Sequence, residues 1–435
     1  MTQDLTDTPL QGAIQRDFPR NAAVMVVWDA IWALGMSLCL FTSVAPAYLL
    51  WLGAPKWVVQ SAMVGFSAIT ILQLFAGRLA QRPWRKLVAF GTWALYATCW
   101  LVYGIVAWLG WGYLPKEIWV PLFLLTMTGL AICNHVGLPI TAGLVLENTP
   151  LRQRGLLVAM RTFALGLCGL GGSFGARWLM GQWPPPTNFH FAFIVGATIF
   201  LVSCLPFLCA FRDNAQRAYP AQNQQTRLRD AIGILWHNFG FRVFLFFFTL
   251  VVAAQSLAPM LIAYGRDTLG MTDADVARFT LMWFVAAIAI GPTVPRLADR
   301  YGFRLVGTFC AAFLVAAFAC PLLLRGNKEA LFAAYACYAA SASLTFVLVA
   351  NLGAELVPEV NPAIIIAFGL TAVMPVSVAI APLTGLLVDV YGTNAYPVVF
   401  LLGGLLGFFA LLGFTGVVRE PRTRQPTIYE RIRRT

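Results

Sequence analysis

Long runs of apolar residues, separated by short polar connections, dominate this chain. A membrane-spanning helix needs about 20 mainly apolar residues, and twelve segments of the sequence meet that requirement. They cover residues 22–52, 57–79, 87–109, 118–146, 155–180, 189–211, 242–264, 274–297, 305–324, 329–354, 362–388 and 396–418. The pattern predicts an all-α membrane protein with twelve transmembrane helices.

One connection is longer and more polar than the others, and it divides the predicted spans into two sets of six. Residues 212–241 are rich in Arg, Gln and Asn, but Leu228, Ile232 and Leu235 recur at helical spacing. Such an amphipathic segment is expected to lie along the membrane surface. The predicted domains are a cytoplasmic tail (1–21), an N-terminal six-helix half (22–211), a cytoplasmic linker with an interfacial helix (212–241), a C-terminal six-helix half (242–418) and a basic cytoplasmic tail (419–435).

Composition and charge support this placement in a membrane. Hydrophobic residues make up 59% of the 435 residues and charged residues only 11%, whereas soluble domains have about 25% charged residues. The net charge of +12 comes from Lys and Arg that cluster beside apolar runs, which is typical of cytoplasmic loops. If the N-terminus is cytoplasmic, most of the 30 Lys and Arg residues lie on that side. We therefore expect a multi-pass protein of the cell (inner) membrane with both termini in the cytoplasm, and no nucleic-acid partner.

The sequence carries no signature of an enzyme, a metal centre or a bound cofactor. No Walker loop, HExxH or GxSxG string occurs, so we expect neither hydrolase chemistry nor direct use of ATP. The nine cysteines lie in apolar segments and form no CxxC pair. They are therefore expected to be packing residues and not a disulfide or zinc framework.

Two short strings recur in equivalent places of the two halves. RLAQR (78–82) follows the second predicted span, and RLADR (296–300) follows the eighth. LENTP (146–150) ends the fourth span and AELVP (354–358) ends the tenth, each with a Glu three residues before a Pro. Because each pair is six spans apart, the strings indicate duplicated six-helix halves.

On these strings the chain resembles the major facilitator superfamily (MFS), whose members contain two related six-helix halves. The family motif between the second and third spans is approximately G-x-L-x-D-R-x-G-R-K. The matching residues are Gly77, Leu79, Arg82, Arg85 and Lys86. Gln81 stands in place of the acid and Trp84 in place of the second glycine. The second copy retains Asp299, Arg300 and Gly302. The resemblance implies the MFS fold, with twelve transmembrane helices in two pseudo-symmetric halves.

The resemblance also implies a cytoplasmic latch. In this family an Arg of the loop pairs with an acid at the cytoplasmic end of the fourth span, and the loop Asp helps to hold the two halves together. Glu147 is the matching acid for Arg82, and Glu355 is the equivalent acid for Arg300. The amide of Gln81 lacks the charge that strengthens a bond to a helix N-terminus. In the alternative interpretation these cations serve membrane topology only.

Two charged residues lie within predicted spans, where a charge is costly and indicates a function. Asp29 lies eight residues past Asn21 and Arg161 seven past Arg154. At about 1.5 Å per residue, both are roughly 10 Å inside the cytoplasmic face. The first and fifth spans are neighbours in the resembled family, so we expect Asp29 and Arg161 to approach each other. They form either a fixed structural ion pair or a working one, in which Asp29 exchanges protons or Arg161 binds an anionic group of a solute.

Other polar residues at membrane depth are candidates for a solute or proton pathway. His135 and Asn134 lie near the middle of the fourth span, Gln255 in the seventh and Asn351 in the tenth. Each forms either a helix–helix hydrogen bond or part of a cavity wall, and His135 is also a candidate for protonation.

Glycine and proline indicate close packing and bending. Gly171 and Gly175 form a GxxxG pair, which predicts a close helix–helix contact at these two residues. Pro259, Pro375 and Pro382 are expected to weaken the seventh and eleventh spans.

Together these features predict a secondary active transporter that moves a small solute across the cell membrane by alternating access. A proton or solute gradient would supply the energy, and a cavity between the halves would bind the solute. The alternative is a non-transporting membrane sensor or assembly partner that retains the fold. The expected partners are a small-molecule solute, a coupling proton and membrane lipids, and the expected state is a monomer without a cofactor.

Overall fold

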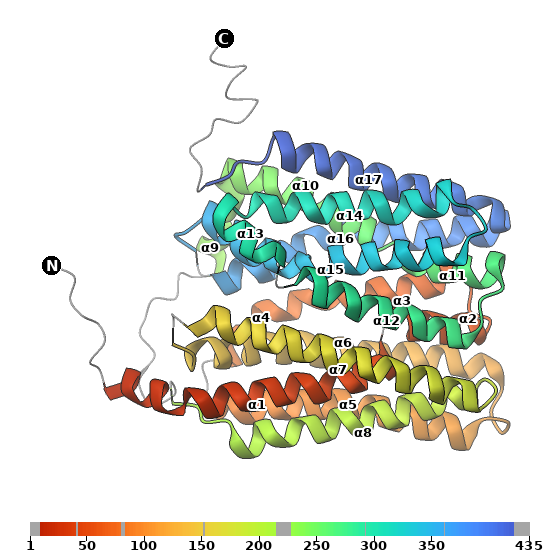
Figure 1. The fold of residues 1–435 in the computed structure, drawn as a ribbon, viewed down its shortest axis with the longest axis horizontal. Coiled ribbons are helices and arrows are strands. Elements are labelled where there is room, and N and C mark those ends of the chain that lie inside the picture. The colour runs from red at the N-terminus through yellow and green to blue at the C-terminus, as the bar shows by residue number, and fades with distance from the viewer. Residues whose placement is uncertain are drawn as a thin grey trace, which may run out of the picture.

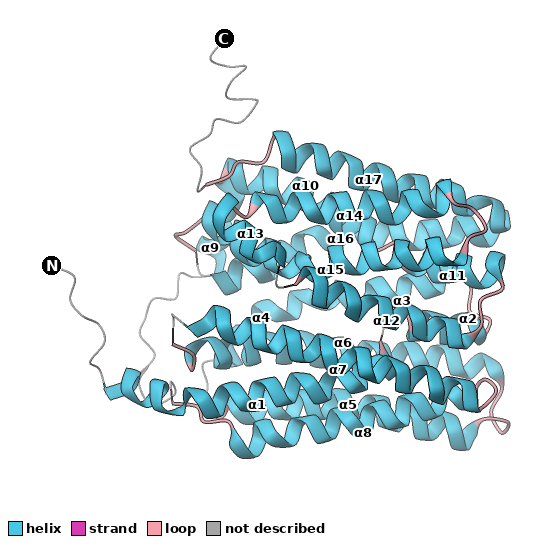
Figure 2. Cartoon of the chain, viewed as in Figure 1, coloured by secondary structure: helices cyan, strands magenta, loops and turns pink. Residues whose placement is uncertain are grey.

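The computed structural model describes residues 9–40, 42–79, 83–150, 153–214, 228–291, 293–360 and 362–421. Helices account for nearly all of these residues (Figure 2), which form no β-strand and contain a single isolated bridge between Trp111 and Leu114. The predicted all-α class is confirmed.

The N-terminal helices run through the lower part of the bundle in Figure 1. They are α1 (Pro9–Cys39), α2 (Val44–Trp51), α3 (Lys56–Ala68), η1 (Ile69–Ile71), α4 (Leu72–Leu79), α5 (Arg85–Gly110), α6 (Lys116–Glu147), α7 (Arg154–Gln182) and α8 (Thr187–Ala210). α1 packs against α7 and α8, and α5 packs against α6 and α8. α1 begins at Pro9, so most of the segment predicted as a tail is helical.

The C-terminal helices occupy the upper part of the same view. They are α9 (Leu228–His237), α10 (Phe239–Gln255), α11 (Pro259–Leu269), α12 (Asp273–Ile290), α13 (Thr293–Tyr301), α14 (Arg304–Leu323), α15 (Lys328–Leu356), α16 (Pro362–Tyr391), η4 (Gly392–Ala395) and α17 (Tyr396–Gly416). α1 begins, and α8 and α17 end, at the left of Figure 1. We call this side of the bundle the terminal end and the opposite side the far end.

The number of spans agrees with the prediction. Within the described ranges, eleven helical stretches are long and apolar enough to cross a membrane. The last stretch, Ile364–Gly416, contains both α16 and α17, which η4 joins. The twelve predicted spans are therefore present.

Four spans are interrupted, and they occupy equivalent places in the two halves. The first span consists of α1 and α2, and the seventh consists of α10 and α11. The second consists of α3, η1 and α4, and the eighth consists of α12 and α13. Pro259 begins α11, as expected for a residue that lacks an N–H and disrupts the preceding turn. Pro375 and Pro382 lie inside an uninterrupted α16, so the predicted weakening of the eleventh span is not seen there.

The two halves meet through α7 with α12 and through α3 with α16. Gly169 lies against the ring of Phe284, where an added Cβ would come within 2.2 Å of a ring carbon. Gly172 packs against α1. Gly171 and Gly175 face open space, so the predicted contact at the GxxxG pair is wrong, because that pair lies on the outer face of α7.

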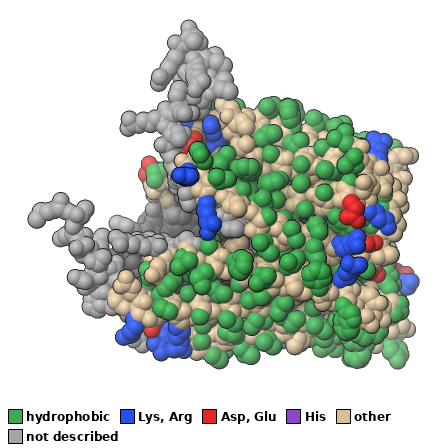
Figure 3. All heavy atoms as spheres, in the orientation of Figure 1, with side chains coloured by type: hydrophobic (Ala, Val, Ile, Leu, Met, Phe, Trp, Pro, Cys, Tyr) green, Lys and Arg blue, Asp and Glu red, His purple; other side chains and the backbone are tan. Residues whose placement is uncertain are grey.

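The surface of the bundle matches a lipid environment. Hydrophobic side chains cover the flank seen in Figure 3, and charged side chains lie towards its two ends. Leu125, Leu383 and Val390 each expose more than 60% of their surface. An apolar belt of this kind is rare on soluble monomers and suits contact with acyl chains.

The amphipathic segment of the linker forms α9. Ala231 and Leu235 are buried, whereas Ile234 and Trp236 are exposed. α9 contacts α10 and α16 at the terminal end. The helix thus has one face on the bundle and one apolar face available to the membrane surface.

Candidate functional site

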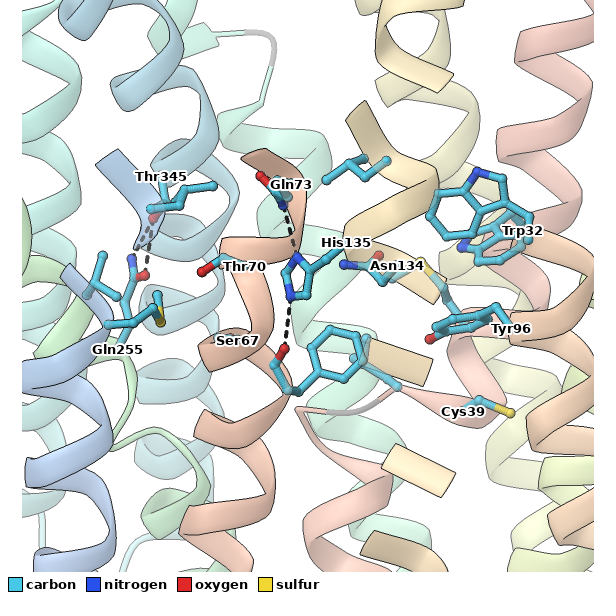
Figure 4. A pocket seen from close by; sticks show the side chains of 18 of the residues that line it. Trp32, Cys39, Ser67, Thr70, Gln73, Tyr96, Asn134, His135, Gln255 and Thr345 are labelled. Atoms are coloured by element: carbon cyan, nitrogen blue, oxygen red, sulfur yellow. Dashed lines mark hydrogen bonds between the residues drawn. The ribbon is translucent and has the colours of Figure 1, made fainter. Parts of the chain in front are cut away.

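A cavity of about 380 Å³ lies between the two halves, about half-way along the spans (Figure 4). The N-terminal half contributes side chains from α1, α3, η1, α4, α5, α6 and α8, and the C-terminal half from α10, α15 and α16. The volume lies in the range of about 300–1,000 Å³ that is usual for small-molecule sites. The described residues that line the cavity include no Asp, Glu, Lys or Arg.

Aromatic rings form the wall on the N-terminal side, and we call this set the aromatic wall. Trp32 packs against Trp93 and Tyr96, with ring centroids 5.0 and 5.5 Å apart, and against Phe200 at 4.2 Å. All four rings line the cavity, whereas Trp28 is buried behind Trp32. The sequence did not single out the rings on α5 and α8, because aromatic residues in spans face lipid, core or cavity without a distinguishing pattern.

His135 lines the cavity and forms two hydrogen bonds. Its Nε2 lies 2.9 Å from the carbonyl oxygen of Phe66, and its Nδ1 lies 2.9 Å from Nε2 of Gln73. A carbonyl oxygen can only accept, so Nε2 carries the proton and Nδ1 accepts from the Gln73 amide. This arrangement satisfies the neutral imidazole. A second proton on Nδ1 would require the Gln73 amide to turn over and present its oxygen.

Several further polar side chains of the lining make no hydrogen bond within the described chain. They include Asn134, beside His135, and Thr70 of η1. Thr70 exposes only 3% of its surface, and its Oγ1 is buried without a partner. A buried hydroxyl without a partner costs free energy unless water or a ligand bonds to it.

The C-terminal candidates differ from each other. Gln255 lines the cavity, and its Nε2 donates to Oγ of Ser341 at 2.9 Å and to Oγ1 of Thr345 at 2.8 Å. It is therefore both a cavity residue and a link between α10 and α15. Asn351 donates to the carbonyl of Val347 in its own helix at 2.8 Å and is not among the residues that line the cavity.

Asp29 and Arg161 form the ion pair expected from the sequence. The Nε and Nη2 atoms of Arg161 lie 2.5 and 3.2 Å from the two carboxylate oxygens of Asp29. The side chains expose only 14% (Asp29) and 27% (Arg161) of their surface. The pair joins α1 to α7 within the N-terminal half, and neither residue lines the cavity.

A polar cluster at the terminal end involves a residue that the sequence did not indicate. Arg85 donates to Glu147 at 2.6 Å and binds both carboxylate oxygens of Asp213 at 2.8 Å. Asn148 donates to the same acid at 3.0 Å, and Lys86 donates to the carbonyl of Phe211 at 2.7 Å. The described partner of Glu147 is thus Arg85, and the bonds to Asp213 join the N-terminal half to the first residues of the linker.

The remaining motif residues are only partly visible. Gln81, Arg82 and the side chain of Asp299 lie outside the described residues. Gly77 lies in α4. Arg300 is exposed and forms no ion pair in the described chain, so the pair expected between Arg300 and Glu355 is not formed in this conformation; an exposed guanidinium is solvated instead.

Polar contacts join the two halves at the far end. Asp389 of α16 accepts from the backbone N–H groups of Lys56 and Trp57, the first residues of α3, at 2.9 and 3.0 Å. The ammonium group of Lys56 also lies 3.1 Å from Asp267 of α11. We call this set the far-end gate.

Two hydroxyl pairs extend the same closure towards the cavity. Ser43 and Thr280 hydroxyls lie 2.8 Å apart, and Tyr335 donates to Thr42 at 3.1 Å. Both pairs cross from the N-terminal to the C-terminal half and are buried. They add two buried contacts between the halves to those of the far-end gate.

The fold and the cavity identify the class of protein to which this chain belongs. Two six-helix halves that enclose a solute-sized space and meet through polar contacts at one end are the architecture of a membrane transporter. A family model described as Major Facilitator Superfamily matches residues 30–382, and the chain belongs to this family. A search of curated protein sequences finds no match.

Solved structures with the same fold are distant in sequence. A mutant of the nucleoside transporter NupG is 16% identical, with a TM-score of 0.67 over 91% of this chain and 98% of that chain. The xylose transporter XylE from E. coli is 13% identical, with a TM-score of 0.65 over 94% of this chain and 100% of that chain. A POT family transporter is 14% identical, with a TM-score of 0.64 over 92% and 95%. At these identities the comparison shows the fold alone.

Proposed function

We propose that this protein is a secondary active transporter that moves a small solute across the cell membrane by alternating access. The observation that carries the proposal is the position of the cavity between the halves, with the contacts that close it at the far end. A solute held between two rigid halves passes across the membrane when these contacts break and equivalent ones form at the opposite end.

The described conformation supports access from the terminal end. Side-chain bonds between the halves are found at the far end, whereas the described bonds of the Arg85–Asp213 cluster at the terminal end join the N-terminal half to the linker. The distribution of Lys and Arg supports a cytoplasmic position for the terminal end. On this basis the protein is in an inward-facing state in the cell (inner) membrane.

The Asp29–Arg161 pair is the strongest candidate for coupling to a proton gradient. Protonation of Asp29 would remove the charge that holds Arg161 and would let α1 and α7 move relative to each other. A fixed pair that only stabilises the N-terminal half is the alternative role. The two roles predict different results for Asp29→Asn, which cannot take up or release a proton. A coupling role predicts the loss of proton-driven accumulation, whereas a purely structural role does not.

Uptake into proteoliposomes tests the function. Because solved relatives include a nucleoside transporter, a D-xylose-proton symporter and a peptide transporter, the panel begins with nucleosides, xylose and short peptides under an imposed pH gradient. We expect accumulation of one class. Asp29→Asn should abolish accumulation but retain exchange of labelled for unlabelled solute. Asp230→Asn, an exposed acid on α9, is the matched control and should leave uptake unchanged.

A non-transporting sensor or assembly partner remains the second candidate function. A protein of this kind would use the same cavity to bind a ligand. Polar groups without hydrogen-bond partners in the lining are compatible with ligand binding alone and with transport. Saturable binding to the purified protein, without uptake or exchange in proteoliposomes, would establish this alternative and refute transport.

A further inference from the structure

We propose that the central cavity binds an uncharged solute with a flat ring, one face of which lies on the aromatic wall while polar groups on its edge bond to Asn134 and Thr70. The inference rests on the proposed function and names the chemical class of its solute. Three observations carry it: the absence of charge in the lining, the arrangement of the rings, and the polar groups that lack partners.

The charge of the solute follows from the lining. The described lining residues include no Asp, Glu, Lys or Arg, and Asp29 and Arg161, which are not lining residues, neutralise each other. An ion transferred from water into such a site would lose its hydration without gaining a counter-charge, which is strongly unfavourable. The two hydrogen bonds of His135 also fit its neutral form. The site therefore selects neutral molecules over anions and cations.

The ring follows from the aromatic wall. Trp32 lies at 34° to Phe200 and at 78° to Trp93, so the rings interlock through edges and tilted faces. This packing fixes the wall before a solute arrives, and a preformed site loses less entropy on binding. Aromatic faces attract the polarised edges and faces of flat rings more than they attract flexible chains. The opposite wall carries Val252, Leu370 and Met374, which are also apolar.

The polar edge follows from the unsatisfied groups. Thr70 Oγ1 is buried without a partner, and the amide of Asn134 makes no hydrogen bond in the described chain. Figure 4 shows both side chains at the cavity, next to His135. Gln255 has its bonds to Ser341 and Thr345 already. The N-terminal half is therefore the side that offers free donors and acceptors.

The volume limits the size of the solute. A space of about 380 Å³ holds about a dozen water molecules at about 30 Å³ each. That room suits a molecule of one or two rings with a few substituents. A polymer or a long acyl chain does not fit within this cavity.

Binding by the purified full-length protein tests the inference with matched pairs of probes. Uridine is compared with uridine 5′-monophosphate, and phenyl β-glucoside with its 6-phosphate, each at up to 10 mM in a thermal-shift assay. At least one neutral member should raise the unfolding temperature in a saturable manner, and its phosphate should bind at least tenfold more weakly. Equal or tighter binding of the phosphates, or no binding of either neutral probe, would overturn the inference.

Variants place the bound solute. Trp32→Ala should weaken binding of the neutral probe about tenfold or more, Trp32→Phe less, and Thr70→Val about fivefold, since each removes a defined contact. Trp178→Ala removes a tryptophan that is 64% exposed on α7 and should leave binding unchanged. Equal effects of Trp32→Ala and Trp178→Ala would refute this position for the solute.

The result is separate from the transport assay. Binding of neutral probes without uptake would support the solute class and refute the proposed function. Uptake of a charged solute, unaffected by Trp32→Ala, would support transport and refute the solute class.

Discussion

At the scale of single residues, polar side chains within the membrane are mostly satisfied by one another. Asp29 accepts two hydrogen bonds from Arg161, and His135 forms hydrogen bonds with Phe66 and Gln73. The loss of stability caused by substituting one of these residues therefore depends on whether its hydrogen-bond or ion-pair partner is still present. When one member of a buried pair is removed, the other is left as an uncompensated charge.

Removing one charge of the Asp29–Arg161 pair should therefore destabilise the protein more than removing both. Asp29→Asn leaves the guanidinium of Arg161 largely buried without its counter-ion. We expect the free energy of unfolding to fall by about 1–3 kcal/mol. Breaking a fully buried pair costs more, about 3–5 kcal/mol. The double variant Asp29→Asn/Arg161→Gln should unfold at a higher temperature than Asp29→Asn. Thermal unfolding of the wild type, both single variants and the double variant checks this, and additive losses would contradict it.

At the scale of helices, the direction in which each face points decides what a motif does. The glycines of α7 are spread around the helix: Gly169 faces α12 in the other half, Gly172 faces α1, and Gly171 faces outwards. Spacing along the sequence identifies residues on a common face, but it does not say whether that face meets a helix or lipid. The GxxxG prediction failed for this reason.

The same substitution at neighbouring glycines of α7 should consequently have opposite effects. At Gly171 an alanine meets nothing within 4 Å, so better helix propensity should stabilise the protein by about 0.5–1 kcal/mol. At Gly169 the added methyl group would collide with Phe284, and such overpacking costs about 1–3 kcal/mol. Unfolding temperatures of Gly169→Ala and Gly171→Ala, measured in one detergent, test the difference in sign. Stabilisation by both would show that the α7–α12 contact is not tight.

At the scale of the whole molecule, the sequence was sufficient for the architecture and insufficient for the site. Long apolar runs predicted the twelve spans, because a helix is the structure that satisfies its backbone within one segment in lipid. The Asp29–Arg161 contact also followed, since both charges were placed at similar depth on neighbouring spans. The bond between Arg85 and Asp213 did not follow, because Asp213 lies 128 residues further along the chain and belongs to no recognised motif. The aromatic wall depended on how α1, α5 and α8 rotate in the bundle.

The contacts of the far-end gate should influence the equilibrium between conformations that are closed and open at the far end. The carboxylate of Asp389 caps the first two N–H groups of α3 across the interface between the halves. Helix N-termini carry unsatisfied donors and partial positive charge, so an acid there is stabilising. Gly385, one turn earlier on α16, brings the backbones close enough for this contact, since a Cβ there would lie 2.6 Å from backbone atoms of Lys56 and Trp57.

Asp389→Asn should therefore shift the population towards a state that is open at the far end. An amide forms weaker bonds than a carboxylate at these donors, and a loss of about 1–2 kcal/mol would change the ratio of the two states about five- to thirtyfold. Thr280 is fully buried beside Ser43 in this conformation. A cysteine introduced by Thr280→Cys should thus react faster with a membrane-impermeant maleimide when Asp389→Asn is also present.

The labelling rate is corrected by subtracting that of the same protein without Thr280→Cys, because native Cys209 is exposed. Glu329→Gln is the matched control, since this acid lies in the first turn of α15. Its side chain is 79% exposed, and its ion pair among the described residues is with Arg278 of the same half. This variant should leave the rate unchanged. If Asp389→Asn also leaves the rate unchanged, the contact between α16 and α3 does not hold the far end closed, and the closure must depend on the buried hydroxyl pairs instead.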